Sequence, residues 1–296
     1  MARGITNSVS HYQMATRRTS GAISIGAILG RTVVYVVMAA IAVTTIGPFV
    51  IMLSASLTKS LLAVTFPFPL IPHPITLDNF ALLFRSTMAL RWLLNSFIVS
   101  GVSTLGCLFT SSMAGYAFAR GKFRGRDLIF TLFLAILMMP TTAQIVPEFI
   151  VLSKLHLINT YTALIAPWFA SIFGTFMLRQ HYLSIPRDYD DAAIIDGASR
   201  FQIYYRVLLP QLRPALATLA VLRFMGNWND FLYPLIVTTR QEMRTLTVGL
   251  TTVNTGGANA GLDMAGAVMG FLPTFIIFMI GQRYLVEGVT LTGIKG

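Results

Sequence analysis

Charged residues are scarce in this sequence. Asp, Glu, Lys and Arg make up 11% of the 296 residues, whereas hydrophobic residues make up 55%. Soluble domains contain about 25% charged residues, because groups that water solvates must cover their surface. This composition excludes a soluble protein of this length, and it predicts that much of the apolar surface faces lipid.

Acidic residues and cysteine are rarer still. The sequence has 11 Asp and Glu against 22 Lys and Arg, which gives a formal net charge of +11. The basic residues form short clusters between apolar runs, which is typical of a membrane protein oriented by its positive loops and not of a protein that binds nucleic acid. Cys107 is the one cysteine, so an internal disulfide and a cysteine metal cluster are excluded, and we expect Cys107 to serve in packing.

The sequence also lacks the motifs of an enzyme. Its histidines show no HExxH pattern and no pair at metal-ligand spacing. The segment from Gly115 to Lys122 resembles a phosphate-binding loop, but it has one intervening residue too many, and Phe123 stands where Ser or Thr is needed. We therefore predict no catalytic residues, no cofactor and no metal ion.

Six apolar segments are long enough to cross a membrane as helices, which takes about 20 residues each. They cover approximately residues 32–56, 92–119, 128–152, 160–178, 211–238 and 264–285. Helices are expected because every backbone N–H and C=O must be paired inside lipid. The predicted fold class is an all-α integral membrane protein, with an N-terminal tail over residues 1–31, a six-span domain over 32–286 and a C-terminal tail over 287–296.

The loops between these segments differ in basic residues. Fifteen Lys and Arg lie before the first segment, in the loops after the second and fourth segments, and from the end of the sixth segment onward, whereas the other loops have six. Cytoplasmic loops hold the excess of Lys and Arg in membrane proteins. Both termini are therefore predicted to lie in the cytoplasm.

The loop between the fourth and fifth segments has the signals of two short helices joined by a tight turn. Ser184 is expected to cap a helix with Pro186 in its first turn, and Gly197 to end it in a left-handed conformation. Asp188, Asp190 and Asp191 then lie near the positive end of the helix dipole. Ser199 is expected to cap a second helix, which Pro210 limits.

This loop contains, in order, Asp191-Ala192-Ala193, three residues, Gly197, nine residues and then Val207-Leu208-Leu209-Pro210. The pattern resembles the EAA loop of ATP-binding-cassette importer permeases. Asp191 stands where the family usually has Glu, and Val207 where it usually has Ile. The resemblance implies a coupling helix at about residues 186–205 that docks on a cytoplasmic ATPase. The coupling residues that it implies are Asp191, Ala192, Ala193, Asp196, Gly197, Leu209, Pro210, Lys295 and Gly296.

Further motifs are Asn95-Ser96, residues 116–126, Trp228-Asn229-Asp230-Phe231 and residues 288–296. They resemble the smaller, six-span permease of maltose-type carbohydrate importers. The resemblance implies a bacterial inner-membrane location, a second homologous permease subunit, a cytoplasmic ATPase dimer that hydrolyses the ATP, and an extracytoplasmic solute-binding protein. The implied solute is a sugar or oligosaccharide, with an acidic saccharide or a glycerol phosphate as alternatives.

A self-sufficient channel or an ion-coupled secondary transporter is the alternative of a different class. It predicts more carboxylates inside the membrane and an inverted repeat, neither of which is evident in the sequence.

Two charged side chains lie well inside the fifth segment. Arg223 and Asp230 are seven residues apart with Asn227 between them, so a continuous helix places them on one face. Charge inside a membrane is costly and rarely faces lipid. We predict that this face lines the translocation pathway or contacts the second permease; an ion pair that only fixes packing is the alternative.

Glu148 is the fourth pathway candidate. It follows Pro147 in the third segment, where Pro140 and Pro147 are both expected to break the helix. Broken helices near the middle of a membrane often border a binding cavity. The alternative is that Glu148 lies at the outer interface, in contact with water.

Overall fold

The computed structural model describes residues 25–59, 71, 73–253 and 259–293, of which nearly all are helical. Within these residues, the only β-type pairing is an isolated bridge between Thr58 and Ile75. The chain divides after Phe49 into two units, and helix α1 (Ile25–Leu57) includes residues of both. Lys295, Gly296 and most of the predicted N-terminal tail lie outside the described residues.

Five helical stretches in the described part are long and apolar enough to cross a membrane. They are Leu29–Leu57, Ala89–Arg120, Tyr161–Ser184, Arg200–Asn229 and Ala260–Leu285. The second is the single helix α3 (Ala89–Arg120), and the last belongs to α13 (Ala260–Gly293). The prediction of an all-helical protein with long apolar spans is therefore confirmed.

The third predicted segment is bent and not straight. Helix α4 (Arg126–Ala135) and the 3-10 turn η1 (Ile136–Met138) meet α5 (Thr141–Lys154) at 103°. The break falls at Pro140, as expected, because a proline forces the residue before it out of the helical conformation. The described residues thus contain six candidate spans if this bent pair counts as one, and five otherwise.

The second break expected in this segment is absent. Pro147 lies inside α5, and the helix continues through it for another turn and more. A proline removes one backbone hydrogen bond from a helix, and membrane helices tolerate this loss where neighbouring groups compensate.

The fifth predicted segment is also interrupted. Helix α10 (Arg213–Asn229) ends where Asp230 adopts an extended conformation, and α11 (Leu232–Val237) follows. The carboxylate of Asp230 accepts the Tyr233 N–H at 3.4 Å, so it pairs a backbone donor at the start of the new helix. The expectation of one helix over residues 211–238 is wrong for this reason.

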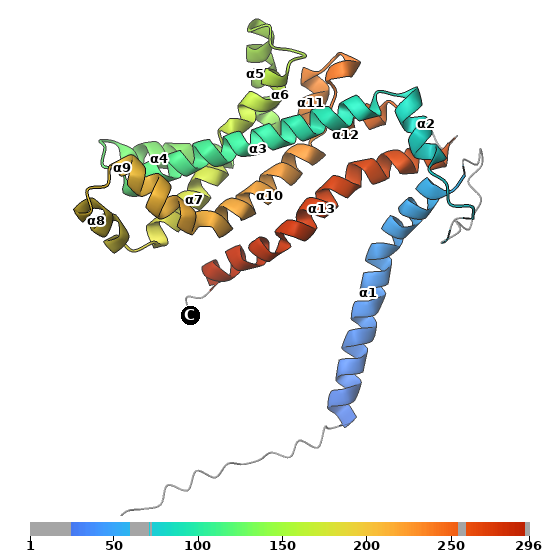
Figure 1. Ribbon diagram of the computed structural model, residues 1–296, viewed down its shortest axis with the longest axis horizontal. Helices are drawn as coiled ribbons and strands as arrows, with labels where there is room; N and C mark the ends of the chain where they lie inside the picture. The colour runs from blue at the N-terminus through green and yellow to red at the C-terminus, as the bar shows by residue number, and fades with distance from the viewer. Residues whose placement is uncertain (1–24, 60–70, 72, 254–258, 294–296) are drawn as a thin grey trace, which may run out of the picture. The chain divides into compact units, whose positions relative to one another are not determined.

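Helix α3 is the central element of the unit formed by residues 50–296. It packs along α7 (Ile172–Ser184) and α10, and α10 packs in turn against α13 (Figure 1). The face that α3 buries is rich in small side chains, which let neighbouring helices approach closely. They are Ser96, Ser100, Ser103, Thr104, Cys107, Ser111, Ser112 and Gly115. The packing role expected for Cys107 agrees with its full burial.

Separate hydrophobic clusters lie at the two ends of α3. One surrounds Tyr182 and Tyr204 where α3 ends, and the other surrounds Trp92 and Trp228 near its start. The loop between the fourth and fifth spans is at the first end, while α2 (Asp78–Ser86) and α12 (Leu246–Thr251) are at the second (Figure 1). The loops predicted to lie on opposite sides of the membrane are therefore at opposite ends of α3.

Candidate functional site

The predicted pair of helices lies between the fourth and fifth spans. Helix α8 (Asp188–Ile195) has three aspartates in its first turn, as expected, and α9 (Arg200–Gln202) follows it. We call residues 188–208 the hairpin. The predicted start of α8 is wrong, because Ser184 is the last residue of α7 and donates its hydroxyl to the His181 carbonyl at 2.8 Å.

The turn of the hairpin forms as predicted. Gly197 has a φ of +77°, in the left-handed region that glycine adopts without steric cost. Its N–H donates to the Ile194 carbonyl at 3.0 Å, and the Ala198 N–H donates to the Ala193 carbonyl at 2.9 Å. This pair of bonds is the Schellman arrangement, which satisfies the last carbonyls of a helix.

The second half of the hairpin begins as predicted but continues further. The Ser199 hydroxyl accepts the Gln202 N–H, and the Gln202 side chain accepts the Ser199 N–H in return. A π-helical turn, η3 (Ile203–Leu208), and a 3-10 turn, η4 (Leu209–Leu212), then lead directly into α10. Pro210 lies within η4, so it changes the type of helix there and does not end the helical path.

The predicted coupling residues divide into exposed and buried groups. Asp191, Ala192, Asp196 and Gly197 are exposed on the hairpin, as is Pro210, while Leu209 is half-buried. Ala193 is 9% exposed and belongs to the cluster around Tyr182 and Tyr204. Ala193 therefore faces the interior of this chain, and its small size serves internal packing.

Large apolar side chains are exposed beside these residues. Ile195 is 85% exposed and Ile194 59%, immediately before the turn. Tyr189, Phe201 and Tyr205 are exposed on the same hairpin. The sequence did not lead us to predict a role for these five side chains, although apolar residues next to Gly197 in a polar loop could have indicated an exposed binding surface. An exposed apolar group of this kind is typical of a surface that binds another protein.

A buried ion pair joins the hairpin to α3. Arg120 Nε lies 3.1 Å from Asp190 Oδ2, and the two side chains are only 8% and 15% exposed. Arg120 also donates from Nη2 to the Ile185 carbonyl at 2.7 Å, in the connection between α7 and α8. The last residue of α3 is therefore bonded both to α8 and to the segment that leads into it.

Tyrosines make a second set of contacts between the hairpin and α3. The Tyr116 hydroxyl donates to the Arg200 carbonyl at 3.2 Å, and the Tyr204 and Ser112 hydroxyls are 2.8 Å apart. The Tyr116 ring packs against the rings of Tyr204 and Tyr182, with centroids 5.3 and 5.7 Å away. Both halves of the hairpin are therefore fixed to the same helix.

A pocket of about 330 Å³ lies at the other predicted site. Its walls come from α5, the 3-10 turn η2 (Ala166–Phe169), α10 and α11. Arg223, Asn227, Asp230 and Glu148 all line it, so the structure brings the four pathway candidates together. We call this the α5–α10 pocket.

Arg223 does not pair with a carboxylate in this pocket. It donates from Nη2 to the Trp168 carbonyl at 3.0 Å, and its guanidinium carbon lies 4.9 Å from the centre of the Trp168 ring. The ion pairs in the described part of the chain join Arg120 to Asp190 and Arg126 to Asp127, and neither includes Arg223. The ion-pair alternative for Arg223 and Asp230 is therefore not what the structure shows.

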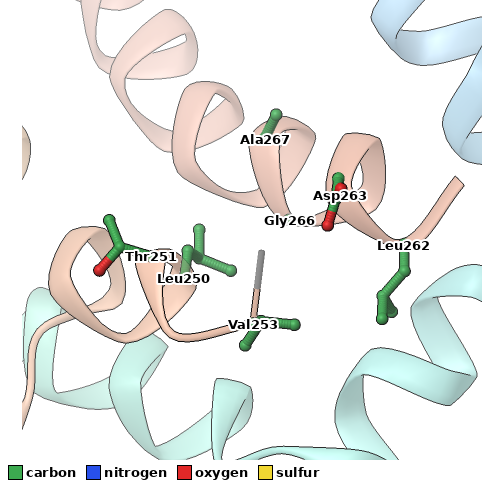
Figure 2. A pocket seen from close by; sticks show the side chains of 7 residues that line it. All are labelled: Leu250, Thr251, Val253, Leu262, Asp263, Gly266 and Ala267. Atoms are coloured by element: carbon green, nitrogen blue, oxygen red, sulfur yellow. The ribbon is translucent and has the colours of Figure 1, made fainter. Parts of the chain in front are cut away.

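A further pocket of about 270 Å³ lies between α12 and α13 (Figure 2). Leu250, Thr251 and Val253 approach it from one side, and residues from Leu262 to Ala267 from the other. It contains none of the predicted site residues. The α5–α10 pocket, by contrast, is lined by all four pathway candidates.

Comparison with known proteins agrees with this architecture. The family described as "Binding-protein-dependent transport system inner membrane component" matches residues 108–290. An arabinooligosaccharides transport system permease protein, AraQ of Bacillus subtilis, is 38% identical over 227 residues, which are 76% of this chain and 81% of that protein. A lactose transport system permease protein, LacG of Rhizobium radiobacter, is 33% identical over 72% of this chain and 78% of its own length.

A solved structure shares the fold. One chain of a bacterial ABC transporter, described as importing the acidic polysaccharide alginate, matches with a TM-score of 0.80 and 21% identity. The match covers 90% of this chain and 99% of that chain. At this level of identity, the likeness concerns the arrangement of the helices.

Proposed function

This chain belongs to the binding-protein-dependent transport system inner membrane components, and we propose that it forms one half of the pathway of an importer for a sugar or oligosaccharide. It is a multi-pass permease subunit of the inner membrane, and ATP hydrolysis resides in partner subunits. The partners that we propose are a second homologous permease, a dimer of ATPase subunits and an extracytoplasmic solute-binding protein.

The observation that supports this function most strongly is the hairpin. Its turn is fixed by Gly197, and it exposes Ile194 and Ile195 beside the polar residues Asp191 and Asp196. An apolar centre with a polar rim is the usual composition of a protein–protein interface. We assign this surface to docking on the ATPase, with Asp191, Ala192, Asp196 and Gly197 among the contacting residues.

The hairpin is built to transmit a displacement to the spans. Residues 185–187 join it to α7 and η4 joins it to α10, so movement of α8 acts on the fourth and fifth spans through the backbone. The Arg120–Asp190 ion pair and the tyrosine contacts extend the same movement to α3. An ATPase that binds the hairpin differently in two states would thus shift the whole group of helices between two arrangements.

The charge distribution supports an orientation. Arg120 ends α3 near the hairpin, Lys122, Arg124 and Arg126 follow it, and five more arginines lie between residues 179 and 213. Because cytoplasmic loops are enriched in Lys and Arg, we place the hairpin and both termini in the cytoplasm. The α2 and α12 end then faces the solute-binding protein.

The proposed class of solute is based on the solutes for which the relatives are named. The two permeases reported above are named for arabinooligosaccharides and lactose. We therefore propose a saccharide that the complex takes up with its binding protein. An acidic saccharide or a glycerol phosphate is the second candidate, motivated by Arg223 in the α5–α10 pocket.

The function can be tested by uptake in cells that lack the gene for this chain. We expect loss of ATP-dependent uptake of a radiolabelled saccharide, such as arabinotriose or lactose, and recovery when the wild-type chain is restored. The variant Gly197→Pro should insert in the membrane without restoring uptake. Full uptake by this variant would contradict a role of the hairpin in coupling.

A further inference from the structure

We propose that the α5–α10 pocket binds the transported solute directly and selects neutral, hydroxyl-rich solutes over anionic ones. This inference rests on the proposed importer function and names the solute class of this subunit. The arrangement of Arg223, Asn227, Asp230, Glu148 and Trp168 supports it.

The guanidinium of Arg223 is already bound to the protein. One of its nitrogens donates to the Trp168 carbonyl at 3.0 Å, and its central carbon lies over the Trp168 ring. A guanidinium held in this way is fixed in position by the chain itself and needs no carboxylate partner. Neither Glu148 nor Asp230 is therefore paired with Arg223, and both oxygens of Glu148 and the Asp230 oxygen that does not accept the Tyr233 N–H can accept hydrogen bonds from a solute.

The pocket also has donors without a partner. Asn227 is 7% exposed, and its Nδ2 has no hydrogen-bond partner among the described residues; the same is true of Arg223 Nε. A buried donor left unpaired costs about 1–3 kcal/mol, so a partner is expected from outside the chain. Asn227 lines the pocket, and a solute there is able to supply that partner.

This combination of donors and acceptors suits hydroxyl groups. A hydroxyl both donates and accepts hydrogen bonds, whereas a carboxylate, sulfonate or phosphate oxygen only accepts. A saccharide hydroxyl can therefore donate to Glu148 or Asp230 and accept from Asn227 or Arg223. The pocket volume of about 330 Å³ is within the range of small-molecule sites.

An anionic solute meets an unfavourable balance of charge. The pocket contains two carboxylates, Glu148 and Asp230, against the single guanidinium of Arg223. Like charges close together repel more strongly where water is largely excluded. An anion could pair with Arg223 but would then leave two carboxylates facing it, so the pocket disfavours acidic saccharides and glycerol phosphate.

The test is direct binding to the intact complex. The complex of this chain with its partner permease and ATPase subunits is placed in lipid nanodiscs, without the solute-binding protein. Binding of radiolabelled arabinotriose and lactose is compared with binding of trigalacturonate and glycerol 3-phosphate. We expect a neutral probe to bind and both anions to bind at least about tenfold more weakly. Tighter binding of either anion, or no binding of any probe, would overturn the proposal.

Substitutions of residues that line the pocket test whether the solute binds there. Asn227→Ala is expected to weaken binding of the neutral probe about tenfold, as the loss of a buried hydrogen bond does. Asn229→Ala is the matched control, because Asn229 lies two residues away, is exposed and bonds only the carbonyl of Met225 in its own helix. The double variant Glu148→Gln, Asp230→Asn should improve binding of the anions. Equal binding by the two asparagine variants, when both complexes assemble normally, would overturn the assignment.

Uptake by the same preparation tests the importer function separately from the assignment of the pocket. If the wild-type complex imports a saccharide with its binding protein while Asn227→Ala binds normally, the pocket assignment is wrong and the importer function stands. If the wild-type complex imports no saccharide at all, the proposed function itself fails.

Discussion

Arg120 and Asp190 form the only ion pair between different helices in the part of the chain that the structure describes. Nε of Arg120 lies 3.1 Å from Oδ2 of Asp190, with both side chains almost fully buried. The pair joins the last residue of α3 to the first turn of α8. Because α3 is also the helix on which α7 and α10 pack, this pair connects the docking surface to the centre of the bundle.

Reversing one charge of this pair should impair transport. Arg120→Glu leaves Asp190 buried against a like charge, and loss of one partner of a buried pair costs about 3–5 kcal/mol. We expect saccharide uptake to fall at least tenfold, while the exchanged pair Arg120→Asp, Asp190→Arg recovers part of it. Uptake and complex assembly are measured in parallel.

The second ion pair of the described chain provides the control. Arg126 and Asp127 are neighbours in sequence, and their side chains are 30% and 74% exposed. Exposed pairs contribute about 0–1 kcal/mol, so Arg126→Ala should transport nearly as well as the wild type. Equal effects of Arg120→Glu and Arg126→Ala would show that burial of the Arg120–Asp190 pair has no importance for coupling.

Ala192 and Ala193 should respond differently to the same substitution. Ala193 is buried beside Tyr204, so Ala193→Leu overpacks the core at a cost of about 1–3 kcal/mol and should lower the melting temperature of the purified complex. Ala192 is exposed, so Ala192→Leu should leave stability unchanged and weaken ATPase binding. The account of the hairpin surface is wrong if the two variants have the same stability and the same ATPase content.

Gly197 should tolerate asparagine better than alanine. Its φ of +77° costs most L-residues about 1–2 kcal/mol, and asparagine less. No atom lies within 4 Å of the position of an added Cβ, so a side chain there meets no steric clash. Gly197→Ala should therefore reduce uptake several-fold, and Gly197→Asn should remain close to the wild type. Gly101→Ala is the control, because Gly101 lies within α3 and its Cβ also meets open space. Limited proteolysis of the hairpin should follow the same order.

Asn95 should be needed for the end of the bundle that is distant from the hairpin. Its Nδ2 donates to the carbonyls of Glu242 and Arg244 at 2.8 Å each, and its Oδ1 accepts the Tyr161 hydroxyl at 2.6 Å. Asn95→Ala removes the partner of the Arg244 carbonyl and of the Tyr161 hydroxyl, at about 1–3 kcal/mol for each, whereas the Glu242 carbonyl keeps its bond from Arg91 Nε. We expect faster proteolysis near residue 242 with the hairpin unaffected; unchanged protection would show that these bonds do not fix the loop.

The turn and the helix cap of the hairpin were predictable from local chemistry. Left-handed glycine and the Ser199 cap depend on a few neighbouring residues, so Gly197 and Ser199 behave as their types predict. Ser184 does not, because α7 extends to it and its hydroxyl bonds the preceding turn. Similarly, a span predicted from hydropathy gives no sign of the break at Asp230, where a side chain competes with the helix for a backbone N–H.

Contacts between distant segments could not be predicted. Four pathway candidates were found from their charge and position, yet the pairing of Arg223 with Trp168 in place of Asp230 depends on how η2 packs against α10. The burial of Ala193 likewise depends on the packing of α8 against η3, whose buried residues belong to the same cluster. Sequence patterns identify which polar and charged side chains are costly to bury. Which groups pair with these side chains depends on the fold.

Purification of the tagged chain from its native membrane in mild detergent, followed by mass spectrometry, tests the central claim most directly. The wild-type chain should recover an ATPase, a second permease and a solute-binding protein. The variant Ile195→Arg, at a side chain that is 85% exposed on the hairpin, should retain the second permease and lose the ATPase. Recovery of the wild-type chain alone or as a homo-oligomer, or an ATPase retained by Ile195→Arg, would contradict an importer subunit coupled through this hairpin.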